Sequence, residues 1–221
     1  MSFFNTHDVE QMKKLAELIR VLNTTGHNPA TSGNYSLRST TSPEYAIVSE
    51  SGVDKSRFDM DHFLPVFFKT REIHELFQRP GRKSSDETDI HLAIYESTNA
   101  GCVLHSHKVE ALLFANLFPR ANYATIEGLE LLKGLKGIKT HETKVEIPLF
   151  ENTQDITLLA DRIRPVLGAS TSANERTYAL ILRGHGIYVW GDTVEDAKRH
   201  LEVFDYLFQY QLEMRRYAWP S

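Results

Sequence analysis

Residues 101–107 read Gly-Cys-Val-Leu-His-Ser-His and carry the strongest local pattern in the chain. We predict a β-strand here, in which side chains two positions apart point to the same side. His105 and His107 therefore face together, and two imidazoles on one sheet face can share a metal ion such as zinc. Cys102 lies an odd number of positions from both histidines, so we expect it to face away as a core residue.

Helices and strands alternate on both sides of this strand, without a linker, a repeat or a low-complexity segment. Apolar residues recur at helical spacing over residues 9–22, and Gly26 ends that helix. Pro65 places one predicted strand at a sheet edge. Further helices are predicted over residues 84–97, 109–117, 128–132, 156–167 and 194–216, and strands over 35–38, 45–48, 63–68, 145–148, 178–183 and 187–190. The alternation favours one mixed α/β domain.

The composition is that of an ordinary globular domain: 221 residues, 41% hydrophobic and 24% charged, with a formal charge of −4. A single cysteine excludes a disulfide framework, and no run approaches the ~18 apolar residues of a membrane span. The first residues lack a basic segment followed by an apolar one, so we expect no secretory signal and a cytoplasmic protein. Mild acidity and the lack of a supporting motif argue against nucleic-acid binding.

Ten histidines beside one cysteine mean that any metal site must be built from histidine and oxygen. His185 lies between two glycines, which permit tight backbone geometry and the close approach of a ligand. Together with His105 and His107 it would supply three ligands and leave a coordination position open, which is the catalytic pattern. Each motif also has an ordinary alternative: two histidines on a half-exposed strand, and a hairpin turn that happens to contain histidine.

Three short polar clusters suit an anion: Ser32-Gly33-Asn34, Ser51-Gly52 and Ser84-Ser85. Each stands at the end of a predicted strand or the start of a predicted helix. Backbone N–H groups in such turns can bind a phosphate, and hydroxyl and amide side chains add donors. Any one cluster alone could be an ordinary turn or helix cap. The Walker and GxGxxG loops are missing from the sequence, so the nucleotide folds built on them lose support.

The sequence does not rank the acids that could transfer protons, because a base is identified by its reach to the substrate and then by its pKa. The candidates are Asp86, Glu87, Glu127, Glu130 and Glu142. Among the seven remaining histidines, which we expect to be surface or structural residues, His91 is predicted to be packed in a helix rather than to bind a metal.

The last predicted helix carries more apolar surface than one helix face normally displays. Its large apolar side chains are Phe204, Tyr206, Leu207, Phe208, Tyr210, Met214 and Tyr217, with Trp219 just beyond. These residues either pack on the core of their own chain or form a subunit interface, where aromatic residues and methionine are enriched. The sequence leaves both alternatives open.

Taken in order, the motifs resemble the class II aldolase family. They are Thr31-Ser32-Gly33-Asn34-Tyr35-Ser36, Ser51-Gly52, Ser84-Ser85, His105-x-His107 and Gly184-His185-Gly186, and they span nearly the whole chain. Within the family, the resemblance is closest to the methylthioribulose-1-phosphate dehydratases of methionine salvage. That narrower resemblance is carried by SGVDK at 51–55, by residues 131–134, by IPLFENT at 147–153, by RGHGIYVWG at 183–191 and by residues 204–208.

The resemblance implies a single α/β domain over residues 1–221, with a central, mostly antiparallel sheet flanked by helices. One zinc ion per subunit would be held by His105, His107 and His185. The phosphate of a sugar-phosphate substrate would contact Ser32, Gly33, Asn34, Ser51, Gly52, Ser84 and Ser85.

The family also places an acid/base glutamate between the histidine pair and the IPLFENT strand. Counting along the chain puts this role on Glu130, with Glu127 as the runner-up. Many members have an acid directly after the serine pair, and the sequence leaves open whether Asp86 or Glu87 would face the metal. Members assemble as homotetramers with the site near a subunit boundary, which favours the interface interpretation of the last helix.

The implied activity is that of a zinc-dependent dehydratase, a hydro-lyase. It would convert 5-methylthioribulose 1-phosphate to 2,3-diketo-5-methylthiopentyl 1-phosphate and water. A base would remove the proton from C3, beside a carbonyl that the metal polarises, and Glu130 would help the C4 hydroxyl to leave. The alternatives are a sugar-phosphate aldolase or a pentulose-phosphate 4-epimerase. A non-catalytic, adducin-like interaction module is disfavoured because all three metal histidines are present.

Overall fold

The computed structural model describes residues 3–169 and 177–217. The strands are β1 (Asn34–Arg38), β2 (Tyr45–Ser49), β3 (Phe63–Phe67), β4 (Cys102–Ser106), β5 (Tyr123–Ile126), β6 (Val145–Phe150), β7 (Ala179–Leu182) and β8 (Gly186–Gly191). The α-helices are α1 (Thr6–Thr24), α2 (Thr88–Ser97), α3 (Val109–Ala115), α4 (Ile156–Gly168) and α5 (Val194–Tyr217). Short 3₁₀ helices are η1 (Pro29–Thr31), η2 (Lys55–Arg57), η3 (Met60–His62), η4 (Glu75–Phe77) and η5 (Glu130–Gly134).

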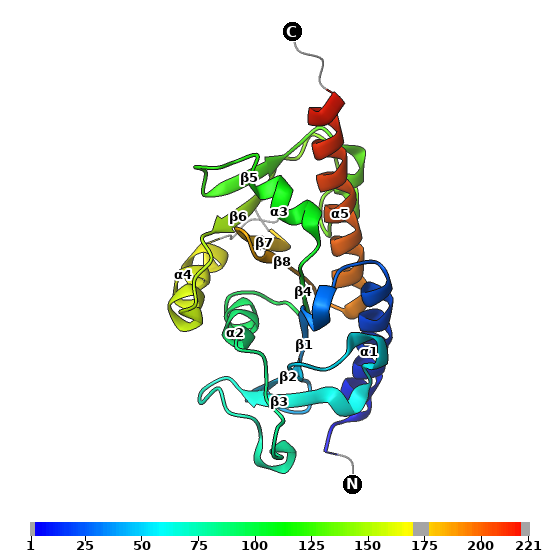
Figure 1. Ribbon diagram of the computed structural model, residues 1–221, viewed down its shortest axis with the longest axis vertical. Coiled ribbons are helices and arrows are strands. Elements are labelled where there is room, and N and C mark those ends of the chain that lie inside the picture. Colours follow the sequence, from blue (N-terminus) through cyan, green and yellow to red (C-terminus); the bar gives the residue numbers. More distant parts are fainter. Residues whose placement is uncertain (1–2, 170–176, 218–221) are drawn as a thin grey trace.

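The strands of the described residues form one sheet in the order β3-β2-β1-β4-β8-β7-β6-β5. Neighbouring strands are antiparallel except for β6 and β7, which run parallel. Helices α1, α3 and α5 gather on one side of the sheet, and α2 and α4 pack against each other on the opposite side (Figure 1). The predicted fold class, a mostly antiparallel sheet flanked by helices, is confirmed.

Most predicted elements lie where the sequence patterns put them, and three differ. The strand β5 was not predicted, because a four-residue strand with only two buried side chains has too short an alternation to recognise. The helix expected near residue 130 is the 3₁₀ helix η5, and α2 begins at Thr88, so Ser84 and Ser85 precede it rather than cap it. As predicted, β3 is the edge strand with Pro65.

The last helix divides its apolar residues between two environments. Phe204, Leu207 and Phe208 are fully buried, and Phe208 stacks on Phe114 of α3 with ring centroids 4.2 Å apart. The large side chains of Tyr206, Tyr210, Met214 and Tyr217 are exposed instead. Core packing therefore explains only one face of α5. Trp219 lies outside the described residues.

Strands β1, β4 and β8 are neighbours at the centre of the sheet. In the antiparallel register, His105 of β4 lies opposite Asn34 of β1 on one side and Tyr188 of β8 on the other. Gly186 at the start of β8 allows the closest approach, because a Cβ there would lie 2.4 Å from the Ser106 carbonyl oxygen and 2.9 Å from His105 Cε1. Residues from β1, β4 and β8 are thereby brought side by side.

No described helix combines the length and apolarity that a membrane span requires.

Asp8 ties the first helix to the loop that follows β1. Its carboxylate accepts hydrogen bonds from Ser39 Oγ at 2.8 Å, from the Thr40 backbone N–H at 2.9 Å and from Thr41 Oγ1 at 2.8 Å. Only 2% of the residue is exposed. Burial by itself would raise the pKa of Asp8, but these hydrogen bonds outweigh it and lower the pKa below its usual value.

We expect Asp8→Asn to lower the free energy of unfolding by about 2–3 kcal/mol at neutral pH, because hydrogen bonds to a charged acceptor are lost. A lowered folded-state pKa means that the carboxylate stabilises the fold above its unfolded pKa of about 3.9 and loses that effect as pH falls further. The difference from the wild type should therefore be constant from neutral pH to about pH 5 and shrink below about pH 4.

Urea unfolding of the two proteins across this pH range measures the difference. The control is Asp161→Asn, which changes an exposed carboxylate paired with Arg164 at 2.5 Å. Exposed pairs are worth about 1 kcal/mol or less, so this control should stay close to the wild type. An Asp8→Asn protein as stable as the Asp161→Asn protein would contradict the prediction.

Candidate metal centre

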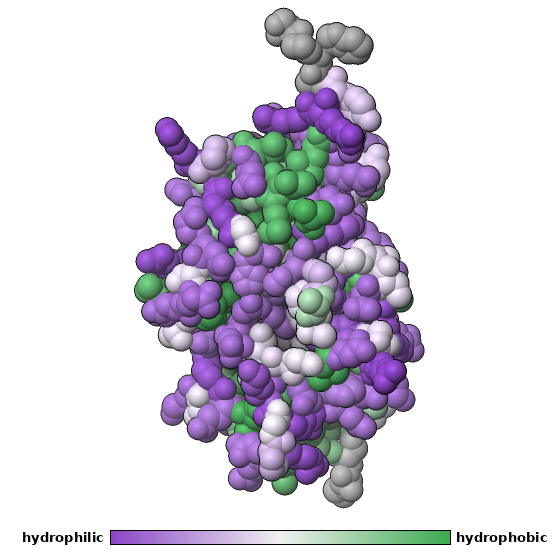
Figure 2. All heavy atoms as spheres, in the orientation of Figure 1, coloured by the Kyte–Doolittle hydropathy of each residue, from purple (hydrophilic) through white to green (hydrophobic). Residues whose placement is uncertain are grey.

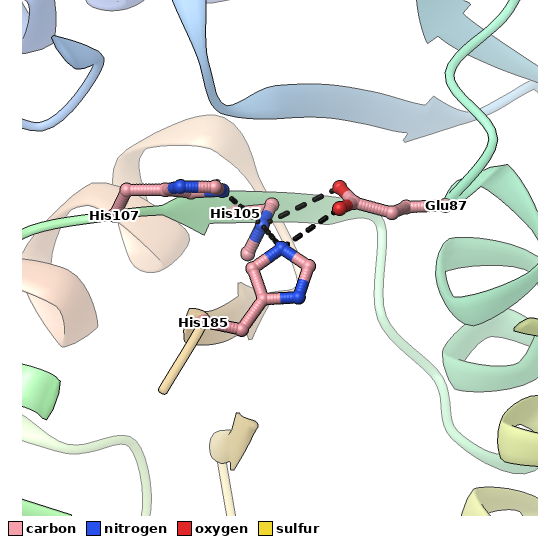
Figure 3. Close-up of side chains that lie close together, drawn as sticks. All are labelled: Glu87, His105, His107 and His185. Carbon is pink, nitrogen blue, oxygen red and sulfur yellow. Dashed lines mark hydrogen bonds and ion pairs between the residues drawn. The ribbon is translucent and has the colours of Figure 1, made fainter. Parts of the chain in front are cut away.

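Three histidines and one glutamate meet where β4 ends (Figure 3). His105 belongs to β4, His107 follows its last residue, His185 lies in the turn between β7 and β8, and Glu87 directly precedes α2. One ligand atom from each side chain lies within 4.8 Å of all the others. The fold thus brings together the three histidines that the sequence analysis singled out, although His105 and His185 are 80 positions apart.

The imidazoles present the same nitrogen, Nε2, to the middle of the cluster. His105 Nε2 lies 2.8 Å from His107 Nε2 and 3.3 Å from His185 Nε2. Ligand nitrogens about 2.0–2.1 Å from a tetrahedral zinc ion lie roughly 3.3 Å from one another. The nitrogen spacing is therefore comparable to that of ligands sharing one ion.

The outer nitrogen of two rings is held by a hydrogen-bond acceptor. His105 Nδ1 lies 3.0 Å from the Ile187 carbonyl oxygen, and His185 Nδ1 lies 3.1 Å from Asn152 Oδ1. Each contact requires the ring to donate its Nδ1–H, which leaves the Nε2 lone pair facing the cluster. Two lone pairs cannot hydrogen-bond to each other, so a cation is the partner that satisfies them. Asn152 belongs to the IPLFENT stretch, which thereby orients a histidine.

Glu87, not Asp86, is the acid that faces the histidines. Glu87 Oε1 lies 2.8 Å from His185 Nε2, and Oε2 lies 3.4 Å from His105 Nε2. Asn34 Nδ2 donates a hydrogen bond to Glu87 Oε2 at 2.5 Å. The sequence left the choice between the two acids open because the backbone path from Ser85 into α2 decides which one turns inward.

The protonation states of the cluster suit a divalent cation. Burial lowers the pKa of His105 well below its usual value, and burial together with the nearby His185 lowers the pKa of His107. Burial by itself would raise the pKa of Glu87, but its contacts with His185, His105 and Asn34 bring it below its usual range. Neutral imidazoles beside an ionised carboxylate are the forms that bind a metal.

A cavity of about 170 Å³ opens beside the cluster, with Glu87 and His107 in its wall. The rest of its lining includes most of the predicted phosphate-binding residues, namely Ser32, Gly33, Asn34, Ser51, Gly52 and Ser85. Ser84 lies outside the lining and forms an isolated β-bridge with Glu50. A larger cavity of about 410 Å³, near Ala100 at the other end of β4, contains none of the predicted site residues.

Gly33 shows why one of these motifs needs glycine. Its φ is +78°, and a Cβ there would lie 2.6 Å from Asn28 Oδ1 and 3.0 Å from the His105 carbonyl oxygen. Any larger residue would both strain the backbone and push β1 away from β4. The glycine therefore lets the turn that ends at Asn34 lie directly against the histidine cluster.

Comparison with known proteins places the chain in a family. The family model described as "Class II Aldolase and Adducin N-terminal domain" matches residues 13–212. The chain belongs to the class II aldolase family. Relatives called methylthioribulose-1-phosphate dehydratase match most of its length. The relative from Picosynechococcus sp. is 37% identical over 95% of both chains. The relative from Bradyrhizobium sp. is 39% identical over 87% of this chain and 86% of its own.

A solved structure of another protein has the same fold. The l-fuculose-1-phosphate aldolase from Thermus thermophilus superposes with a TM-score of 0.67 and 22% identity, over 96% of this chain and 97% of that one. At this identity the likeness describes the architecture alone.

Lys55 is a residue of this site that the sequence analysis did not select. It lines the same cavity and is only 2% exposed. Its Nζ lies 3.2 Å from the Val53 carbonyl oxygen and 3.4 Å from that of Thr31, and no ion pair with a carboxylate is formed among the described residues. Burial lowers its pKa. Its position in SGVDK was the available signal, but sequence does not show whether a lysine points inward.

Three of the acids that the sequence offered for proton transfer lie away from the metal centre. Glu127, Glu130 and Glu142 are exposed, and none lines the cavity or joins the histidine cluster. The Glu130 side chain is 70% exposed and pairs with Lys133 and, at 3.7 Å, with His141. The hydrogen bond from Lys133 lowers its pKa. Within one chain, the fold does not bring Glu130 to the histidines.

We expect the metal-free protein to gain thermal stability when Zn²⁺ is added. Saturating a site at about 100 times its Kd stabilises the fold by about 2.7 kcal/mol, which for a chain of this size is roughly 5–10 °C in Tm. Replacing His185 by alanine should abolish the gain, because one of the convergent nitrogens is removed. Differential scanning fluorimetry and metal analysis after dialysis measure both effects.

The control is His7→Ala, which changes an exposed histidine on α1 and should leave the zinc response intact. Wild-type zinc stoichiometry in the His185→Ala protein would show that the cluster is not the metal site.

Proposed function

We propose that this protein is a metal-dependent methylthioribulose-1-phosphate dehydratase. It would remove water from 5-methylthioribulose 1-phosphate to give 2,3-diketo-5-methylthiopentyl 1-phosphate. The observation that carries the proposal is the junction of a three-imidazole cluster with a cavity built from anion-binding turns. A ketose phosphate uses both, since its carbonyl needs an electrophile and its phosphate supplies binding energy that orients the reacting carbons. The names of relatives at 37% and 39% identity support this choice of substrate.

His105, His107 and His185 would hold the metal, and imidazole ligands suit zinc. The donor set fits such an ion, because the hydrogen bonds at Nδ1 of His105 and His185 commit both rings to present Nε2. Three protein nitrogens leave a position for substrate oxygen, as catalytic sites do. When bound, the ion supplies Lewis acidity that polarises the substrate carbonyl and acidifies the adjacent C–H.

The cavity beside the cluster would bind the phosphate. The turns at Ser32–Asn34 and Ser51–Gly52 line this cavity, and the buried Ser32 Oγ has no hydrogen-bond partner among the described residues. Lys55 is the cation of the lining, while the charge of Glu50 is offset by Arg82 at 2.9 Å. We include Lys55 among the phosphate ligands, and contact by Ser84 stays a prediction because it does not line the cavity.

Two glutamates are candidates for the proton transfers at C3 and C4. Glu87 already lies in the cluster and is ionised, so it can accept a proton or serve as a further metal ligand. Glu130 is exposed and paired with Lys133, so it can act only if another subunit's metal centre docks against it. Covering Glu130 at such a boundary would weaken the lysine contact and raise its pKa towards that of a general acid.

We further propose that the protein is a homotetramer. Apolar surface gathers over the part of the molecule formed by α3, β5 and the far half of α5 (Figure 2). The exposed large apolar side chains of these elements are Val109, Leu113, Tyr123, Tyr206, Tyr210, Met214 and Tyr217. Aromatic and methionine side chains exposed together are typical of subunit interfaces. The neighbouring η5 carries Glu130 and the exposed Leu131, so an interface there would also cover Glu130.

The enzyme would work in the cytoplasm as a step of methionine salvage, with residues 1–221 as a single class II aldolase-like domain. A sugar phosphate carries a charge that keeps it inside the cell that made it, which supports this location.

Incubating the zinc-loaded protein with 5-methylthioribulose 1-phosphate should release water and form the 2,3-diketone, which absorbance and mass spectrometry detect. The matched control substrate is the unphosphorylated sugar, which should turn over poorly because it lacks the group that the cavity binds. Formation of an aldehyde fragment or of an epimer, in place of the diketone, would assign the site to aldol cleavage or epimerisation.

We expect Glu130→Gln to keep its zinc and to lose dehydration activity by roughly 10²–10⁴-fold, the usual contribution of a proton-transfer group. Near-normal turnover of this variant would remove Glu130 from the mechanism. Metal analysis of the same sample separates loss of chemistry from loss of the ion.

Mixed assemblies test whether Glu130 acts between subunits. Dissociating and reassembling Glu130→Gln with His185→Ala should recover part of the wild-type activity, since one chain supplies the intact metal centre and its neighbour supplies Glu130. The control mixture, Glu87→Gln with His185→Ala, should recover none, because both changes damage the cluster of their own chain. If the two mixtures behave alike, Glu130 does not act across the boundary.

A further inference from the structure

His91 lies on α2 and is enclosed in the core, with 2% of the residue exposed. Its Nδ1 lies 2.7 Å from Ser36 Oγ, and its Nε2 contacts Asn34 Oδ1. Ser36 Oγ in turn lies 2.8 Å from the Tyr95 hydroxyl. At the other end, Asn34 Nδ2 bonds to Glu87 Oε2 at 2.5 Å. A continuous chain of hydrogen bonds therefore runs from Tyr95 in the core to Glu87 at the metal centre.

The contact at the metal centre gives these hydrogen bonds their direction. Asn34 turns its amide nitrogen towards Glu87 and donates to Oε2. Asn34 Oδ1 then faces His91, whose Nε2 must carry the hydrogen. The Nδ1 of His91 is left as an acceptor, which takes the proton of Ser36, and Ser36 Oγ accepts from Tyr95. Each group in this series of hydrogen bonds therefore donates to the next group on the side of Glu87.

The opposite orientation is excluded by the same contacts. It would set Asn34 Oδ1 against the Glu87 carboxylate, two acceptors with no proton between them. Burial lowers the pKa of His91 to about 3, so the ring is neutral and has one N–H to donate. Since that N–H is directed to Asn34, the neutral ring selects one of the two amide orientations.

Asn34 is placed where its orientation affects the metal centre. It pairs with His105 in the register of β1 and β4, so its backbone is fixed relative to the cluster. The side chains of His185 and Asn34 both contact the Glu87 carboxylate at hydrogen-bond distance. Once His185 Nε2 is used for a metal, Asn34 remains as a neutral donor that holds the Glu87 carboxylate.

We propose that His91 is a positioning residue: by donating to Asn34 Oδ1 it turns the Asn34 amide nitrogen towards Glu87 and holds that carboxylate against the three histidines. The inference rests on the metal centre of the proposed function. It gives a role to a helix residue that touches neither the metal ligands' nitrogens nor the cavity.

Two variants of His91 that differ in reach test the proposal. In His91→Gln the amide nitrogen lies about as far along the side chain as Nε2, so it can still donate to Asn34. In His91→Asn the amide reaches only as far as Nδ1, so it can bond Ser36 but not Asn34. The control is His200→Asn, because His200 is equally buried and makes two hydrogen bonds, to Trp190 and Lys136, away from the cluster.

The readout is a Co²⁺ titration of each metal-free protein, followed by visible absorption, together with kcat and KM of the zinc enzyme. We expect His91→Asn to change the cobalt bands and to lose about 10–100-fold in Co²⁺ affinity or in kcat, as removal of an outer hydrogen-bond partner does. His91→Gln should keep the wild-type bands. His200→Asn should lower Tm but leave bands and kcat unchanged, because the hydrogen bond to Lys136 that it removes lies away from the cluster.

Wild-type bands and kcat in His91→Asn, or equal changes in His200→Asn, would overturn the positioning role. If His91→Asn does not fold, His91→Phe tests the same contact, because it keeps a ring of similar size in the core but has no N–H to donate to Asn34, and it should change the cobalt bands as well. Unchanged bands and kcat in His91→Phe would then overturn the proposal. If the unchanged protein itself binds no Co²⁺, the metal centre fails, and the proposed function fails with it.

Discussion

Three imidazole nitrogens that converge on one point suit a divalent cation, and several elements of the fold bring them together. β4 carries His105, the hairpin of β7 and β8 carries His185, and the Ile187 carbonyl and Asn152 commit these two rings to one tautomer. Gly186 lets the hairpin approach β4 closely enough for the nitrogens to meet. The hydrogen bonds behind the rings, as well as the rings themselves, suit the cluster to a metal ion.

Two neighbouring regions of the site differ in the charge of the group that they suit. The histidine cluster carries the ionised Glu87 and suits a cation, while the adjoining cavity carries the buried Lys55 and turn amides and suits an anion. Asn34 belongs to both, since it lines the cavity and bonds to Glu87. A substrate with a carbonyl near one end and a phosphate at that end would span both regions, which is the geometry that a ketose 1-phosphate offers.

A single chain brings together the histidine cluster and the adjoining cavity but leaves Glu130 on its surface, next to an apolar region of α3, β5 and α5. In the proposed tetramer, the docking of another copy would cover both the exposed apolar side chains and Glu130. In this view assembly would complete the site as well as stabilise the fold, because covering Glu130 changes its solvation and therefore its acidity.

The sequence by itself determined most of the element order, the shared direction of His105 and His107 and the opposite direction of Cys102, because strand parity and helical spacing are local properties. Ordered motifs were sufficient to identify the family. Only the tertiary structure decided that Glu87 rather than Asp86 faces the histidines, that Lys55 points inward, that Ser84 stays outside the cavity and that Glu130 lies on the surface. These outcomes depend on how a loop enters a helix or how distant strands stack, and no local pattern encodes such contacts. His91 was predicted correctly as a packed residue, but its hydrogen bonds to Asn34 and Ser36 became visible only when α2 lay against β1.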